Sequence, residues 1–66
     1  MIVYVNQKPY TVETGITLDA LMHTIGIQPQ GVAVAIAYEV IPQKQWKETV
    51  LTDNMELMLI HAVSGG

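Results

Sequence analysis

The residues best suited to chemistry in this chain are the last two, Gly65 and Gly66, which follow a strongly apolar segment with only Ser64 between. A free α-carboxyl group has a pKa of about 3.5 and is therefore an anionic nucleophile at neutral pH. Such a carboxylate can attack the α-phosphate of ATP and form an acyl adenylate. Glycines lack a Cβ and accept almost any backbone angle, so an extended glycine tail fits a narrow active site on another protein. The pair predicts a carrier that is activated at Gly66, and the alternative is a frayed tail.

The remaining side chains offer little further chemistry. His23 and His61 fall on different predicted elements, and neither belongs to an HExxH pattern. The chain has no Cys, which excludes a thiolate nucleophile and a Cys-based zinc site. Its six acidic residues are scattered over predicted turns and edges, and no glycine-rich loop opens a helix as a phosphate site requires. We therefore expect no catalytic side chain, metal site or bound cofactor, and a protein co-substrate rather than an enzyme.

Length and charge limit the classes of partner. A chain of 66 residues is too short for two domains or for a core that encloses a substrate cavity. A net charge of −3, with three Lys and no Arg, argues against nucleic acid. The apolar runs fall short of the roughly 20 residues that span a membrane, and the N-terminus lacks the basic start of a signal peptide. We expect a cytoplasmic protein with one domain over residues 1–63 and a flexible tail over residues 64–66, bound to neither nucleic acid nor membrane.

The first part of the chain predicts a β-hairpin. Residues 2–6 are mostly apolar and β-branched on both parities, which suits a strand covered on both faces or central in a sheet. Pro9 opens a second strand, in which Tyr10 and Val12 share one face, and Gly15 ends the hairpin.

A short amphipathic helix is expected next, over Leu18–Ile25. Thr17 is the N-cap candidate, and Gly26 stands where a left-handed residue ends a helix. Its apolar stripe has the i, i+3, i+4, i+7 spacing and consists of Leu18, Leu21, Met22 and Ile25.

The second half of the chain predicts three strands and a short helical turn. In order they are a third strand over Val32–Ala37, a short fourth strand at Val40–Ile41 stopped by Pro42, a helical turn over Gln43–Lys47, and a last strand over Glu56–Val63. The first and last strands are the most apolar, so we expect them to be neighbours at the centre of the sheet. A hairpin, a crossing helix and a parallel return strand make an α+β protein with the β-grasp, or ubiquitin-like, architecture. We expect a mixed sheet of four to five strands with one main helix on one face, and the alternative is a small α+β roll with another strand order.

Three large apolar side chains have two interpretations each. Met22 and Met58 fit core positions better than a methionine-rich site, and Trp46 is either a partner anchor or, more commonly, a staple between a loop and the core. The last strand is apolar on both parities, whereas one short helix covers one face. Its other face is therefore either exposed for a partner or covered by loops and the turn around Trp46.

Over its whole length the sequence resembles the sulfur carrier proteins of bacterial thiamine biosynthesis, the ThiS family. The segments that carry the resemblance are Ile2-Val3-Tyr4-Val5-Asn6, Gly15-Ile16-Thr17-Leu18, Leu21-Met22, Val32-Ala33-Val34-Ala35-Ile36, Val40-Ile41-Pro42, Trp46, Asp53 and the final strand to Gly65-Gly66. The chain departs from the family at Ala37-Tyr38, where Asn and Gly are common, and at Gln43, where a basic residue is common. The absence of Arg puts in doubt any docking that relies on an Arg of the carrier.

The resemblance implies a mechanism. A ubiquitin-activating-enzyme-like adenylyltransferase uses ATP to adenylate Gly66, sulfur from a cysteine desulfurase replaces the AMP, and thiazole synthase takes the sulfur from the resulting thiocarboxylate. Gly65 and Ser64 belong to the tail that enters the partner active sites. The alternatives are the small subunit of molybdopterin synthase, a carrier of another pathway, a ubiquitin-like modifier and an interaction domain with an idle glycine pair.

Overall fold

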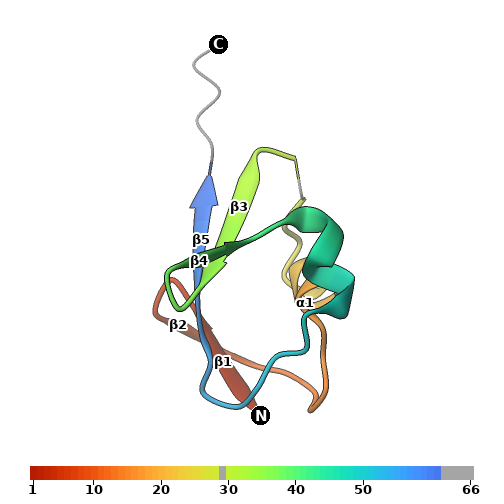
Figure 1. Cartoon of the computed structure of the whole chain (residues 1–66). Coiled ribbons are helices and arrows are strands. Elements are labelled where there is room, and N and C mark those ends of the chain that lie inside the picture. Colours follow the sequence, from red (N-terminus) through yellow and green to blue (C-terminus); the bar gives the residue numbers. More distant parts are fainter. Residues whose placement is uncertain (29, 62–66) are drawn as a thin grey trace.

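The computed structural model describes residues 1–28 and 30–61. The elements follow the predicted order, with boundaries within one or two residues of the expected ones (Figure 1). They are β1 (Ile2–Val5), β2 (Lys8–Thr11), α1 (Leu18–Thr24), β3 (Val32–Ile36), β4 (Glu39–Ile41), the 3-10 helix η1 (Gln43–Glu48) and β5 (Glu56–His61). The predicted continuation of the last strand to residue 63, and the predicted tail at 64–66, lie outside the described residues.

The strands form one mixed sheet in the order β2-β1-β5-β3-β4. Strand β5 is central and runs parallel to β1, with Tyr4 opposite Glu56 and Val5 opposite Leu57. The β1–β2, β3–β5 and β3–β4 pairs are antiparallel. The prediction that the first and last strands are neighbours is therefore confirmed, and so is the five-strand β-grasp topology.

Helix α1 begins and ends where the local sequence predicts. The Thr17 hydroxyl accepts a hydrogen bond of 3.2 Å from the Ala20 N–H and so satisfies one of the free donors of the first turn. The helix stops at Thr24, and Gly26 has a φ of +76°, a left-handed conformation that glycine adopts without a Cβ clash.

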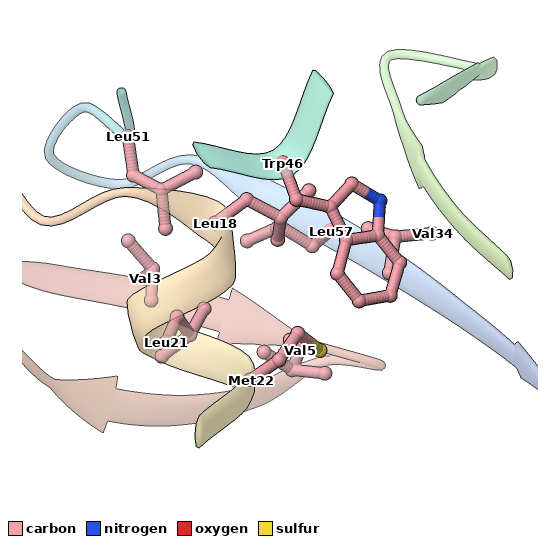
Figure 2. Close-up of a cluster of buried hydrophobic side chains, with 9 residues drawn as sticks. All are labelled: Val3, Val5, Leu18, Leu21, Met22, Val34, Trp46, Leu51 and Leu57. Carbon is pink, nitrogen blue, oxygen red and sulfur yellow. The ribbon is translucent and has the colours of Figure 1, made fainter. Parts of the chain in front are cut away.

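The core lies between the sheet and the two helices, which pack on the same face of it. Figure 2 shows side chains from both layers converging there, and the cluster consists of Val3, Val5, Leu18, Leu21, Met22, Val34, Trp46, Leu51 and Leu57. Full burial of one such aliphatic side chain contributes about 1.5–3 kcal/mol. The predicted core position of Met22 is confirmed, since 2% of this residue is exposed.

Trp46 ties η1 to the core. It is 1% exposed, and its Nε1–H donates a hydrogen bond of 2.9 Å to the carbonyl of Ile41 at the end of β4. The staple interpretation of Trp46 is confirmed, and a partner has no access to this side chain.

The prediction that Met58 is a core residue is wrong, because 52% of it is exposed. Of the two alternatives for the first strand, coverage on both faces is excluded by the 39% exposure of Ile2, and an interior position in the sheet is confirmed, because β1 lies between β2 and β5. The cause of both exposures is that α1 and η1 pack on the same side of the sheet, the side that buries Val3 and Leu57. Side chains of opposite parity on β1 and β5 therefore point away from both helices.

Candidate functional site

The sheet surface that points away from α1 and η1 is apolar. Its residues, here called the outer face, are Ile2, Tyr4, Ala33, Ala35, Val40, Met58 and Ile60. The register brings three of them into a row, because Ala35 lies opposite both Met58 and Val40. Four large side chains of this surface, Ile2, Val40, Met58 and Ile60, are 39–58% exposed. The sequence left open whether the second face of the last strand is exposed for a partner or covered by loops and the turn around Trp46. It is exposed, because no helix or loop among the described residues covers the outer face.

Asn6 extends the contact between β1 and β5 beyond the last backbone pair. Its Nδ2–H donates to the Leu59 carbonyl at 3.2 Å, and its Oδ1 accepts from the Leu59 N–H at 2.8 Å. The side-chain amide of Asn6 thus makes the two hydrogen bonds to Leu59 that the backbone of a further β1 residue would make in the sheet. Asn6 has a φ of +51°, a conformation that Asn adopts more readily than most residues. The result is that the second half of β5 is held on both sides, by β3 and by Asn6.

The beginning of β5 is also tied to β1. The carboxylate of Asp53 accepts a hydrogen bond of 2.9 Å from the Ile2 N–H, and the Asn54 N–H donates to the Ile2 carbonyl at 2.7 Å. The Tyr4 N–H donates to the Met55 carbonyl at 2.9 Å. The acidic turn singled out in the sequence therefore serves to fix the start of the strand that leads to residues 64–66.

The residues predicted to react or to enter partner sites, Gly66, Gly65 and Ser64, lie outside the described residues. The structure does describe the strand that precedes them. β5 reaches His61, which pairs with Val32 of β3, and Figure 1 shows it in the middle of the sheet. The chain thus continues toward Gly65 and Gly66 from a strand with a neighbour on each side.

The remaining candidate groups are spread apart. His23 is exposed on α1, and His61 ends β5, as expected from the sequence. Within residues 1–28 and 30–61, no three residues among His, Asp and Glu are close enough to hold a metal ion. In the same part of the chain, no helix has the length and hydropathy needed to cross a membrane.

Two open hollows mark the described surface. One, of about 590 Å³, lies between α1 and η1 and is lined by Asp19, Pro42, Gln43, Lys44 and Lys47. The other, of about 810 Å³, is lined by residues of the β1–β2 turn, the β3–β4 turn and the start of β5, among them Asn6, Tyr38 and Met58. We call the second hollow the outer-face groove.

These features define a small ubiquitin-like β-grasp protein with an uncovered apolar sheet face. The model of the ThiS family matches residues 3–66. The chain belongs to the ThiS family.

Relatives of known name agree with this assignment. The crystal structure of a thiamine biosynthesis protein (ThiS) from Geobacter metallireducens is 25% identical, covers all of both chains and superposes with a TM-score of 0.85. The sulfur carrier protein ThiS of Escherichia coli K12 is 25% identical over 61 residues, which cover 92% of each chain. A thiazole synthase of Magnetococcus marinus is 29% identical over all 66 residues, and the chain spans only 20% of the length of that relative.

The family match confirms the predicted resemblance and the predicted fold. It also favours the ThiS carriers over the small subunit of molybdopterin synthase, the alternative with the same tail. Sequence reasoning missed Asn6 as a positioning residue and treated it only as the last residue of the first strand. A local signal was present, because Asn is enriched among residues with positive φ, but its partner Leu59 lies 53 residues away in the chain.

Proposed function

We propose that this chain is a sulfur carrier of thiamine biosynthesis and that Gly66 carries the sulfur as a thiocarboxylate. The observation that supports this most strongly is the ThiS family match, which extends from residue 3 to residue 66 and so includes both glycines. The central position of β5, the strand that leads to them, agrees with it.

The proposed reaction takes place on the chain's own carboxylate. A Gly66 oxygen attacks the α-phosphate of ATP bound by a ubiquitin-activating-enzyme-like adenylyltransferase, and pyrophosphate leaves. A cysteine desulfurase takes sulfur from cysteine and holds it as a persulfide, and the outer sulfur of this persulfide attacks the acyl carbon and displaces AMP. A thiol, such as that of free cysteine, then reduces the resulting acyl disulfide and releases the thiocarboxylate. The carrier supplies one nucleophilic group and no catalytic side chain, and ATP is bound by the partner. Gly65 and Ser64 serve as the narrow tail that crosses the partner's active-site channel. We assign these steps to the cytoplasm.

The outer face is the surface on which we expect partners to dock. An enzyme that takes up residues 64–66 must contact the chain beside the end of β5, where Ile60 is 44% exposed. From there the apolar surface continues without interruption through Met58 to Val40. Stable protein complexes bury about 800 Å² on each partner, and an apolar sheet face next to the reactive tail provides such a surface.

Thiazole synthase is the proposed consumer of the sulfur. The Magnetococcus marinus protein of that name contains a segment similar to this entire chain within a polypeptide about five times as long. Joining two interacting proteins in one polypeptide raises their effective concentration, which supports a functional pairing between a ThiS-like domain and thiazole synthase.

The mass of the intact protein tests the proposal. The chain is incubated with ATP, a cognate adenylyltransferase, a cysteine desulfurase and cysteine. The expected result is a mass gain equal to the replacement of one oxygen by sulfur, absent without ATP and located at Gly66 by fragmentation. A variant that lacks Gly65 and Gly66 is the control and stays unmodified although it folds. An unchanged mass of the full chain, with an adenylyltransferase shown to be active on its own carrier, would refute the proposal.

A further inference from the structure

The hairpin between β3 and β4 has a turn that its residues do not favour. Ile36 pairs with Glu39, so the loop consists of Ala37 and Tyr38 alone. Their φ angles are +53° and +67°. Two-residue hairpin loops with two positive φ angles normally contain Asn and Gly, because a Cβ clashes with the backbone in the left-handed region. Here both positions carry a Cβ, and one carries a bulky ring.

The fold gains no visible compensation from the ring of Tyr38. The residue is 98% exposed, and its side chain forms no hydrogen bond with the residues described in the structure. Asn6 in the β1–β2 turn provides the contrast, because its positive φ accompanies two hydrogen bonds to Leu59. Folding therefore accounts for Asn6 and leaves Tyr38 without a structural reason.

The position of Tyr38 on the surface suggests contact with a partner as the reason for a tyrosine in this turn. It lines the outer-face groove, and Ala35 and Met58 belong to the same lining. Val40, two residues further along the chain, is 58% exposed. Tyrosine in such a position offers a partner a large, rigid contact surface, and it is among the residues most enriched where interfaces bind tightly.

We propose that Tyr38 is a contact residue that sets the affinity of this carrier for thiazole synthase, at the expense of turn stability. The inference rests on the proposed function. The pairing of Ile36 with Leu57 places the turn near the start of β5, and His61 lies four residues further on, about 13 Å away along the strand. An enzyme that holds the tail beyond His61 and buries a surface of ordinary size on the outer face reaches Tyr38.

Charge defines the matching surface of the enzyme. The charged residues that line the outer-face groove are Asp53 and Glu56, both acidic, and no Lys lines it. The complementary surface is therefore an apolar patch with an adjoining Lys or Arg. Thiazole synthase is chosen as the occupant because a protein of that name contains a segment similar to the whole of this chain.

Two glycine substitutions distinguish the effect of the Tyr38 ring from the effect of the strained turn backbone. Tyr38→Gly removes the ring and relieves the backbone, whereas Ala37→Gly relieves the backbone next to it and keeps the ring. Each variant of the full chain is compared with wild type by thermal unfolding and by calorimetric titration, first against thiazole synthase and then against the adenylyltransferase, both from the same organism. We expect both variants to raise the Tm by about 2–6 °C. Only Tyr38→Gly is expected to weaken binding, by about tenfold, and Tyr38→Phe is expected to bind within about threefold of wild type.

Four results would overturn the inference. Binding by Tyr38→Gly that equals wild type removes the contact role, and an equal loss in Ala37→Gly assigns the effect to turn geometry. A lower Tm for Tyr38→Gly shows that the fold uses the ring after all. A loss toward the adenylyltransferase alone excludes thiazole synthase as the occupant. If wild type itself fails to bind thiazole synthase, the proposed partner is refuted, and this result is distinguishable from the four others.

Discussion

Replacing Asn6 by alanine tests whether one side chain holds the second half of β5 in place. The variant loses both hydrogen bonds to Leu59, of 3.2 and 2.8 Å. It also leaves a residue with a plain Cβ at a φ of +51°. Because the hydrogen bonds join positions 53 residues apart, no local rearrangement restores them.

The expected loss of stability is the sum of the two lost hydrogen bonds and the cost of an alanine Cβ at positive φ. Each hydrogen bond contributes about 0.5–1.5 kcal/mol net, and a left-handed alanine costs about 1 kcal/mol. The sum is about 2–4 kcal/mol, against a total stability of about 3–10 kcal/mol for a domain of this size. Asn6→Gly is the matched control, since it loses the same hydrogen bonds without the Cβ clash. It is expected to lose about 1 kcal/mol less than Asn6→Ala.

The assay uses the chain's single tryptophan. Trp46 is 1% exposed, so urea unfolding changes its fluorescence, and the midpoint and slope give the free energy of unfolding. Hydrogen exchange of the Leu59 amide supplies the local measurement, because this amide donates to Asn6 and its protection reports opening of that bond. We expect exchange at Leu59 to accelerate more than exchange at Val34 in the core. Unchanged protection of Leu59 in Asn6→Ala would refute the argument, whatever the global stability does.

Three further substitutions give separate checks. Trp46→Phe removes the indole N–H that donates to the Ile41 carbonyl and part of a fully buried ring, and it is expected to lower the free energy of unfolding by about 2–4 kcal/mol, measured by circular dichroism in urea. Thr17→Ala removes the cap of α1 and is expected to cost about 1 kcal/mol by the same measurement, with Thr17→Ser as the control that keeps the hydroxyl. Met58→Asp places a charge on the outer face, where 52% of Met58 is exposed. It is expected to change stability by about 1 kcal/mol or less while weakening binding to thiazole synthase at least tenfold, and unimpaired binding would exclude the outer face as the docking surface.

The elements of the fold could be predicted because local rules decide them. Thr17 and Gly26 mark the ends of α1 through capping and a left-handed turn, and both lie within a few residues of the groups they satisfy. The pairing of β1 with β5 could be predicted as well, because the first and last strands are the most apolar of the chain and apolar strands take the middle of a sheet. Each of these signals is contained in the residues of the element itself.

The coverage of the sheet could not be predicted in the same way. The alternation along β5 divides Leu57 from Met58 but does not say which parity faces the helices, or whether η1 packs on the same face as α1. In the structure, η1 packs on the α1 side, where Trp46 joins the core cluster and donates to the Ile41 carbonyl, and these contacts form only in the folded chain. Similarly, nothing near Asn6 in the sequence indicates its bonds to Leu59, because the register between β1 and β5 creates them.

The residues proposed to set affinity differ from the residue proposed to react. Met58 lies on β5 and Tyr38 in the β3–β4 turn, on a sheet held in place by long-range hydrogen bonds, and neither supplies a group to the proposed reaction at Gly66. Changes to the outer face should therefore raise the KM for the carrier and leave kcat near its wild-type value, because they remove binding that substrate and transition state share. Changes to Gly65 should lower kcat instead, because a Cβ there displaces the carboxylate from its in-line approach to the α-phosphate. The two classes of variant thus give opposite kinetic signatures on one enzyme, and an outer-face variant that lowers kcat alone would contradict the division.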